Sequence, residues 1–265
     1  MTRLPVKKTY KLFIGGAFPR SESGRTYEAQ GRNVARASRK NVRDAVVAAR
    51  TAQPKWGGMT AYNRGQVLYR IAEMMEARTA EFAELTTGKD EVGRAVDRWV
   101  WYAGFADKLA QVLGSSNPVA GSYFNFTVPE PTGVVGIVAP DDPPLLGLVS
   151  RIAPALVGGN SVVALASETS PFAAVELAEV LATSDVPAGA VNLLTGRRAE
   201  LAPWLASHMD VNAIDVTGAD GLRADLERAA AENVKRVVHG EPDSQSLWDI
   251  SAFLELKTVW HPIGL

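Results

Sequence analysis

Two short stretches of this sequence combine residue types that could do chemistry. Asp141 and Asp142 are adjacent carboxylates ahead of two prolines, and such a pair could bind a cation or act as acid and base. Because adjacent side chains generally point apart, we favour an ordinary surface loop here. Gly218–Arg223 could receive a phosphate at a helix amino terminus, although Asp220 places negative charge beside it. Its glycines could equally serve only to turn the chain from strand to helix.

The chain of 265 residues contains no cysteine, which excludes disulfides, thiolate metal sites and a cysteine nucleophile within it. Its three histidines, His208, His239 and His261, do not stand at the spacing of a metal site, so we expect no metal. No apolar run approaches the roughly 20 residues of a membrane span, and the first residues lack the apolar core of a secretory signal. We therefore expect a cytoplasmic protein that does not bind membranes.

Charge is unevenly distributed along the chain. The first fifty residues hold twelve Lys or Arg against three Asp or Glu, which leaves +9 there and −10 for the rest of a chain of net charge −1. A nucleic-acid-binding arm is one interpretation. Because the basic residues are interleaved with strand-like and helix-like patterns and lack an aromatic platform, we favour a solvated face or a surface that docks on an acidic partner.

Pro131–Pro171 predicts the element order strand, turn, helix and strand in one continuous run. Val134–Val138 is β-branched and apolar, the composition of a buried parallel strand. Prolines then stop the strand, and apolar residues recur at helical spacing from Leu145 until Gly158–Gly159 supplies a C-cap. Ser161–Leu165 is apolar and strand-like again. The stretch therefore predicts a βαβ unit whose loop lies at the carboxyl end of the first strand, where α/β folds bind ligands.

Strand and helix alternate along most of the remaining chain. We expect a hairpin that turns at Gly15–Gly16, and a helix that begins with a capping box at Asn41–Asp44 and ends before Pro54. The other expected helices and strands are two long amphipathic helices at 63–87 and 91–113, and shorter elements at 172–181, 186–196, 199–206, 213–217, 222–231 and 234–238. This alternation predicts an α/β fold, a Rossmann-like doubly wound parallel sheet with helices on both faces, built from residues 1–113 and 132–240.

Pro131–Pro171 resembles the aldehyde dehydrogenase superfamily, whose matching segment reads roughly GVVGxIxPWNFPL…APALxxGNxVVxKPSExTP. This chain matches the pattern at Gly133–Gly136, Pro140, Pro144–Leu145, Ala153–Leu156, Gly159–Asn160, Val162–Val163, Ser167–Glu168 and Pro171. The family's Trp-Asn-Phe is replaced by Asp141-Asp142-Pro143, and its Lys-Pro by Leu165-Ala166. Val186–Gly196 is similar to the family's xPPGVVNVVTG, and Phe253–Trp260 is similar to YTEVKTV at its extreme carboxyl end.

The resemblance implies that the family's catalytic groups are missing from this chain. The nucleophilic cysteine belongs to a catalytic domain that family enzymes carry between the equivalents of Val238 and Phe253, and it has no counterpart here. The asparagine that helps to hold the oxyanion aligns with Asp142, a carboxylate that repels negative charge. The general-base glutamate falls on Gly240, with Glu241 one residue off. We therefore expect that the chain alone does not oxidise aldehydes.

The resemblance also implies an altered site for NAD, the family's cofactor. The lysine near the adenosine ribose is replaced by Leu165, and the loop FTGSxxxG keeps Gly218 but has Arg223 in place of its second glycine. The positions at which the family pattern still places cofactor-binding residues are Pro140, Ser167, Glu168, Gly196 and Gly218. Binding of NAD at these positions stays an open expectation.

Two elements that the family uses for subunit contact are retained. The resemblance implies an oligomerisation ribbon at 114–131 and a tail strand, Phe253–Trp260 within 252–265, with a linker at 241–251 in place of the catalytic domain. In family dimers the tail strand extends the catalytic-domain sheet of a partner. We therefore expect a pseudoenzyme that acts as a structural or regulatory subunit and assembles with a full-length aldehyde dehydrogenase.

Two other functions remain open from the sequence. One is an NAD(P)-dependent aldehyde oxidoreductase that is active only in a composite complex, in which the partner provides the cysteine and the base. The other is a nucleotide sensor without catalysis. Both require an intact cofactor pocket, so a titration with NAD or NADP separates them from a purely structural subunit.

Overall fold

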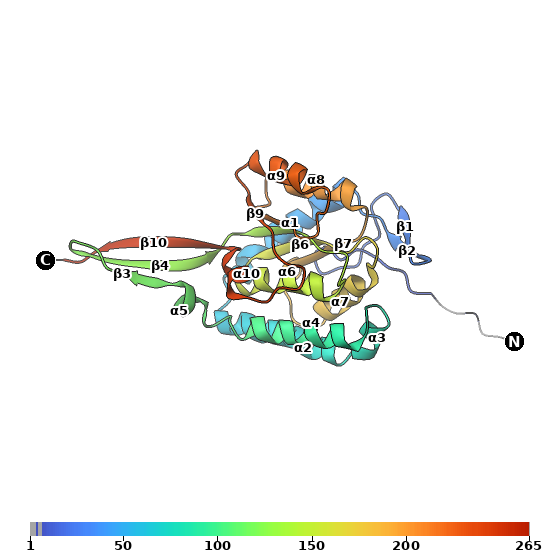
Figure 1. Cartoon of the computed structure of the whole chain (residues 1–265), viewed down its shortest axis with the longest axis horizontal. Coiled ribbons are helices and arrows are strands. Elements are labelled where there is room, and N and C mark those ends of the chain that lie inside the picture. Colours follow the sequence, from blue (N-terminus) through green and yellow to red (C-terminus); the bar gives the residue numbers. More distant parts are fainter. Residues whose placement is uncertain (1–3, 5–6, 265) are drawn as a thin grey trace.

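A five-stranded parallel sheet forms the centre of the molecule (Figure 1). The computed structural model describes Leu4 and residues 7–264. In spatial order the strands are β7 (Val191–Leu194), β6 (Ser161–Leu165), β5 (Val134–Val138), β8 (Ala213–Asp215) and β9 (Arg236–Val238). The chain first builds outward from β5 to β7 and then crosses to β8, so the direction of winding reverses between β5 and β8. The expected doubly wound α/β fold is confirmed.

Helices cover both sides of this sheet, and each side has its own hydrophobic core. The helices of the first side are α2 (Ala61–Glu76), α4 (Lys89–Ala103), α6 (Leu146–Val157) and α7 (Phe172–Ala182), and those of the second are α1 (Arg39–Gly57), α8 (Arg198–Ser207) and α9 (Arg223–Ala231) (Figure 1). Side chains of β5 divide between the two: Val135 and Ile137 pack in the first core, and Val134 and Val138 in the second. A strand that is buried on both faces must show this alternation.

The N-terminal segment covers the outer edge of β7. Phe13 exchanges both backbone hydrogen bonds with Leu193, at 2.9 and 2.8 Å. Ile14 and Ala17 then pair with each other across Gly15–Gly16, so the expected hairpin turn is confirmed. The strands that follow are β1 (Thr26–Ala29) and β2 (Arg32–Ala35), which form an antiparallel hairpin. This end of the sheet therefore has a covered edge, which blocks pairing with other chains there.

A second sheet projects from the body as a long ribbon (Figure 1). It has the order β10-β4-β3, with β3 (Ser115–Asn117), β4 (Tyr123–Pro131) and β10 (Leu254–Pro262). β10 pairs antiparallel with β4 over its whole length, from Leu254 opposite Pro131 to Pro262 opposite Tyr123. The tail strand is thus bound to the ribbon of its own chain, and in the described part of the chain its outer edge has no neighbouring strand.

The boundaries of α1 differ from the sequence prediction. Its capping box is formed by Ser38 and Asn41 rather than by Asn41 and Asp44, because the Ser38 hydroxyl accepts from the Asn41 amide while the Asn41 side chain accepts from the Ser38 amide. α1 also continues past Pro54 for a further turn. Trp56 in this turn is fully buried and donates its indole N–H to a carbonyl of α6 at 3.0 Å, which holds the last turn in place.

The two long amphipathic helices are each interrupted. The helix expected over 63–87 is α2 followed by the short α3 (Thr79–Ala83), and the one expected over 91–113 is α4 followed by α5 (Leu109–Leu113). At the first interruption the side chain of Arg78 forms ion pairs with Glu176 and Glu179 of α7. The spacing of apolar residues along a helix does not reveal such long-range ion pairs, so the pattern predicted one uninterrupted helix.

The start of α6 depends on a side chain from α4. Glu91 is buried, and one of its carboxylate oxygens accepts from the amides of Leu145 at 2.8 Å and Leu146 at 3.1 Å. The other oxygen accepts from the amide and the hydroxyl of Thr87. The first amides of a helix have no partner within the helix, and a carboxylate there also complements the helix dipole. Glu91 therefore fixes where α6 begins behind the β5 loop.

Candidate functional site

The carboxyl edge of the parallel sheet is where the sequence places the candidate cofactor site. The loops at this edge follow β5 at 139–145, β6 at 166–171, β7 at 195–197 and β8 at 216–222. The predicted positions in these loops are Pro140, Ser167, Glu168, Gly196 and Gly218. Because the four strands are parallel and in register, the structure brings these five residues to one edge of the sheet. Gly218 follows β8, and the other four follow β5, β6 and β7, on the other side of the point where the winding reverses.

Asp141 joins the β5 loop to the β6 loop. Its Oδ1 accepts from the Ser167 hydroxyl at 2.9 Å and from the Glu168 amide at 2.8 Å, and it forms an ion pair with Arg198 at 3.0 Å. Burial disfavours the charged carboxylate, but the charge of Arg198 and these hydrogen bonds outweigh it, so the pKa of Asp141 lies below its usual value. The adjacent Asp142 is exposed, so the two carboxylates face different surroundings and do not form an acid–base pair.

Two arginines at the start of α8 hold Glu168. Its carboxylate accepts from the Arg197 guanidinium at 2.8 Å and from the Arg198 amide at 2.7 Å. The Arg198 guanidinium also donates to the Ala139 carbonyl at 3.0 Å. These contacts connect the loops after β5, β6 and β7 in one ionic cluster. The carboxylate that the sequence assigned to a cofactor is therefore engaged by the protein's own arginines.

Gly218, Gly196 and Pro140 each have a packing role. A Cβ on Gly218 would collide with the backbone of Ala139, directly after β5, and a Cβ on Gly196 would lie only 2.8 Å from α8. Pro140 is buried against α6, where a Cβ on Gly147 would lie 2.5 Å from the proline ring. Close approach of one part of the chain to another accounts for Gly196 and Gly218 without a cofactor, and Pro140 is in the same way packed within the protein.

Gly240 follows β9 and lies against a buried arginine of α6. Its amide donates to the Thr217 hydroxyl at 3.0 Å, and a Cβ would lie 2.8 Å from a guanidinium nitrogen of Arg151. Arg151 is fully buried and forms ion pairs with Asp215 at 2.6 Å and with Asp249 at 3.0 Å. The space into which a general base would project from position 240 is therefore filled by this charge cluster.

The charge cluster around Arg151 is the main feature of the site that the sequence analysis missed. Arg151 is the single charged residue of α6, and every residue of that helix is buried. A charge in an otherwise apolar helix was a signal that it has a buried partner, because unpaired buried charges are very costly. Burial lowers the pKa of Arg151, but Asp215 and Asp249 raise it by more, so the group stays charged.

The segment between β9 and β10 packs on α4 and α6. Arg98 donates to the Asp243 carbonyl at 2.8 Å, and Arg94 pairs with the Asp243 carboxylate at 2.5 Å. The stretch expected as a linker contains the short helix α10 (Leu247–Ser251), whose Ile250 is fully buried. This segment is an ordered cover on the body that leads directly into the ribbon.

Three pockets of the described part of the chain lie away from the carboxyl edge. They are lined by the N-terminal segment and β1–β2, by α2 and α4, and by α1 and α8. Among the described residues, no His, Asp and Glu side chains gather in threes or more to hold a metal ion, and no helix is long and apolar enough to span a membrane. At the carboxyl edge, Asp141, Ser167 and Glu168 are bonded to other groups of the protein, which fits NAD poorly at these residues.

Known proteins align with most of this chain. The sequence model of the aldehyde dehydrogenase family matches residues 25–241. The chain belongs to the aldehyde dehydrogenase family. The 2-hydroxymuconic semialdehyde dehydrogenase of Pseudomonas sp. (strain CF600) is 36% identical over 87% of this chain and 51% of its own length. The cytosolic 10-formyltetrahydrofolate dehydrogenase of Xenopus tropicalis is 33% identical over 89% of this chain and 29% of its own length.

Solved structures share the fold. An aldehyde dehydrogenase of Bacillus cereus, solved as its NAD+ complex, has a TM-score of 0.79 at 27% identity and covers 87% of this chain and 50% of its own. HpcC from Thermus thermophilus has a TM-score of 0.83 at 32% identity, with 88% and 48% covered. The chain spans about half the length of the first relatives it matches. The family resemblance inferred from the sequence is confirmed.

Proposed function

We propose that this chain is a non-catalytic aldehyde dehydrogenase homologue that assembles, as a structural or regulatory subunit, with a full-length member of the family. One observation carries the proposal. β10 is the edge strand of the projecting ribbon (Figure 1). The backbone groups along its outer edge have no neighbouring strand among the described residues. A long unpaired edge adds readily to the sheet of another protein.

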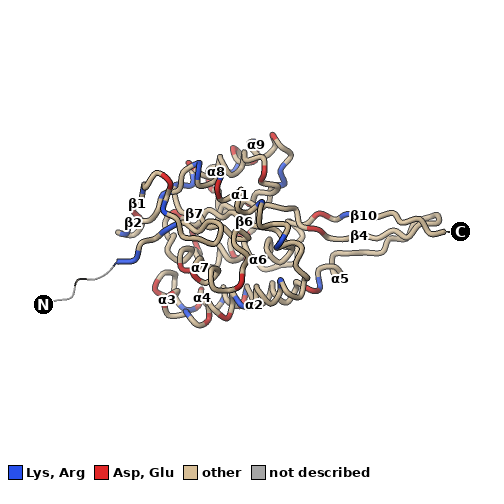
Figure 2. The backbone as a smooth tube through the Cα atoms, turned by 180° about the vertical axis from the view of Figure 1, so that it is seen from behind, with Lys and Arg blue, Asp and Glu red and all other residues tan. Residues whose placement is uncertain are grey.

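The side chains of the ribbon support a buried contact. Leu256, Val259 and Trp260 of β10 and Tyr123 and Phe124 of β4 are between 40% and 59% exposed. The outer part of the ribbon carries no Lys, Arg, Asp or Glu (Figure 2). Exposed aromatic and aliphatic side chains free of nearby charge are the kind that protein interfaces bury. The ribbon therefore has both the backbone edge and the apolar surface that a partner sheet requires.

The body of the protein supports a role without catalysis. The chain has no cysteine, and the positions of the family's oxyanion asparagine and general base hold Asp142 and Gly240. A side chain long enough to act as a base at position 240 would displace Arg151 from Asp215 and Asp249. At position 240 the substitution is therefore part of the packing, because Arg151 occupies the space that a base would need.

A composite NAD(P)-dependent oxidoreductase is the competing function, and it requires that this chain hold the cofactor. The ionic cluster at the carboxyl edge argues against it, because Asp141 and Glu168 are engaged by Arg197 and Arg198. A nucleotide sensor at this edge meets the same objection. The structural role is favoured because it needs only the ribbon.

Co-purification from the native cell tests the proposal. A tagged chain should recover a full-length aldehyde dehydrogenase in fixed stoichiometry. Trp260→Asp places a charge on the exposed ribbon and should abolish recovery, whereas Tyr62→Asp on exposed α2 should leave it unchanged. Recovery of the wild-type chain only as a monomer or homo-oligomer would contradict the proposal.

A further inference from the structure

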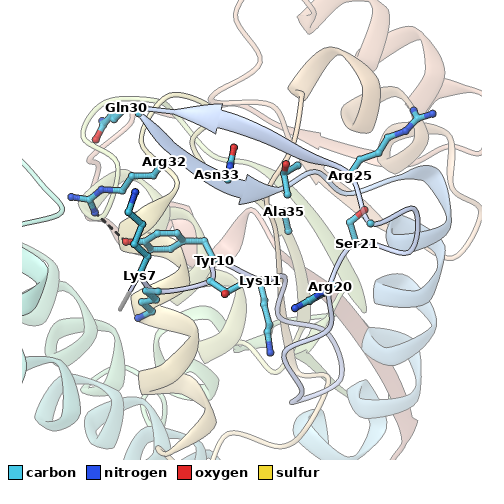
Figure 3. Close-up of a pocket in the computed structure, with 15 residues that line it drawn as sticks. Lys7, Tyr10, Lys11, Arg20, Ser21, Arg25, Gln30, Arg32, Asn33 and Ala35 are labelled. Atoms are coloured by element: carbon cyan, nitrogen blue, oxygen red, sulfur yellow. Dashed lines mark hydrogen bonds between the residues drawn. The ribbon is translucent and has the colours of Figure 1, made fainter. Parts of the chain in front are cut away.

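A pocket of about 710 Å³ opens between the N-terminal segment and the β1–β2 hairpin (Figure 3). It lies at the end of the body opposite the ribbon (Figure 1). None of the five predicted cofactor positions lines it. The volume is within the range of about 300–1,000 Å³ that is typical of small-molecule sites. The pocket is therefore large enough for a ligand of nucleotide size and is separate from the candidate cofactor site at the carboxyl edge.

The lining of this pocket is strongly basic, and the described residues that form it include no Asp or Glu. Its Lys and Arg residues are Lys7, Lys8, Lys11, Arg20, Arg25 and Arg32. Two of these are engaged within the protein: Lys8 pairs with Glu176 at 2.5 Å, and Arg32 donates to the Tyr10 hydroxyl at 3.0 Å. Lys11, Arg20 and Arg25 take part in no ion pair of the described part of the chain. The positive charge of the pocket is therefore largely unneutralised.

Lys11 and Arg20 are placed to act together. They lie on two segments that run side by side, joined by the hydrogen bond from the Leu12 amide to the Pro19 carbonyl at 3.1 Å. Figure 3 shows both side chains beneath the hairpin, with Asn33 on the hairpin above them, while Arg25 lies at one end with its guanidinium directed away. Like charges held on the walls of one cavity repel each other and focus a positive potential into it. A bound anion would relieve this repulsion.

We infer that this pocket binds a small polyanion that carries a polyphosphate group. A guanidinium matches the oxygens of phosphate in pairs, and a lysine ammonium adds a mobile point charge. The pocket supplies this combination in Arg20 and Lys11, with the side-chain amide of Asn33 as a neutral donor. Several cations around one cavity suit several linked anionic groups better than a single phosphate.

The same lining excludes a nucleic-acid strand as the favoured occupant. Single strands are held by aromatic rings on which successive bases stack. Among the described residues of the lining, the only aromatic one is Tyr10, which is buried and has its hydroxyl engaged by Arg32. The β1–β2 hairpin forms one wall of the pocket (Figure 3). A compact ligand therefore fits better than a polymer.

Isothermal titration calorimetry of the whole chain at low salt tests this inference. The probes are inorganic tripolyphosphate, ATP, citrate and a hexaglutamate peptide. We expect tripolyphosphate to bind with one-to-one stoichiometry, and citrate and the peptide to bind at least tenfold more weakly. Higher salt should weaken the binding, because it screens the charges of the exposed Lys and Arg side chains. Tighter binding of ATP than of tripolyphosphate would identify a nucleotide as the source of the group, and equal binding would identify polyphosphate alone.

The decisive variants are matched for charge. The double variant Lys11→Gln and Arg20→Gln should lose at least tenfold in affinity for tripolyphosphate, while Arg70→Gln and Arg228→Gln, on exposed sites of α2 and α9, should stay within twofold. Unchanged thermal melting of both double variants verifies that they fold. Absence of saturable binding at millimolar tripolyphosphate, equal loss in the two double variants, or equal binding of the peptide would overturn the inference.

Discussion

The guanidinium of Arg151 lies 3.0 Å from the carboxylate of Asp249 and 2.6 Å from that of Asp215. This cluster joins α10, on the segment that leads into the ribbon, to β8 of the parallel sheet. The resemblance to the family places the general base at Gly240, and a Cβ there would lie against the same guanidinium. The segment that leads into the ribbon is therefore attached to the body through the charge cluster beside Gly240.

Replacing Arg151 tests how firmly this cluster holds the segment. Arg151→Met should lower the free energy of unfolding by about 3–5 kcal/mol, because Asp215 and Asp249 would be left as buried charges without a cationic partner. Urea denaturation followed by circular dichroism measures the change. Arg228→Met removes a solvent-exposed pair with Asp225 and should cost less than about 1 kcal/mol. Small and equal effects in the two variants would count against a structural role for the cluster.

A second prediction separates packing from cofactor binding at Gly218. Gly218→Ala should destabilise the chain by about 1–3 kcal/mol, because the new Cβ meets the Ala139 backbone, which cannot move without distorting β5. Gly93→Ala, in an exposed turn of α4 with open space around it, should instead stabilise the chain by up to about 1 kcal/mol. Thermal denaturation of both variants without any nucleotide measures the difference. A Gly218→Ala variant as stable as the wild type would refute the packing explanation.

The ionic cluster at the carboxyl edge predicts weak cofactor binding. Calorimetric titration of the chain with NAD or NADP should show no saturation at millimolar cofactor, because Asp141 and Glu168 are already engaged by Arg197 and Arg198. A full-length family enzyme in the same buffer serves as the positive control. A dissociation constant in the micromolar range would revive the composite oxidoreductase and the nucleotide sensor.

The stability of the chain should depend on pH through Lys235. Its ammonium donates to the carbonyls of His208 at 2.9 Å and Val211 at 2.6 Å, and burial lowers its pKa from 10.5 to about 8. Between these two values the unfolded chain binds this proton and the folded chain has released it. The free energy of unfolding should therefore rise between pH 8 and pH 10, by at most about 1.4 kcal/mol per pH unit.

Lys235→Met isolates this contribution. Urea denaturation at several pH values from about 7.5 to 9.5 should show a shallower rise in the variant than in the wild-type chain, because the group that titrates has been removed. Below pH 8 the wild-type slope should also flatten, since Lys235 is then charged in both states. Equal slopes in the two proteins would show that Lys235 keeps its ordinary pKa.

The central fold was predictable because its strands carry their own signal. Val134–Val138 and Ser161–Leu165 are continuous apolar runs, and the structure places both strands at these same residues. The partners of the buried charges gave no such signal. Arg151 and Asp249 are 98 residues apart, and the Glu91 carboxylate and the Leu145 amide are 54 residues apart. Periodicity and caps describe local structure, whereas the pairing of distant charges depends on how the finished helices and strands are arranged.

The candidate site was predictable in its position but not in its chemistry. The family pattern placed Pro140, Glu168 and Gly218 at the carboxyl edge, and the structure has them there. The sequence contains no sign that Arg198 reaches across from α8 to Asp141 and Ala139. Such a contact requires that the loops after β5 and β7 lie side by side at the carboxyl edge, and only the folded sheet brings them together.

Hydrogen exchange along β10 tests the central claim most directly. The chain is measured alone and in a mixture with the full-length aldehyde dehydrogenase from the same cells, and peptides covering Leu254–Pro262 are compared. We predict slower exchange of the β10 amides in the mixture, because the amides on the free edge would donate to a strand of the partner. Amides of α9 serve as the internal reference and should not change. Identical exchange of β10 in the two samples would contradict assembly through the ribbon.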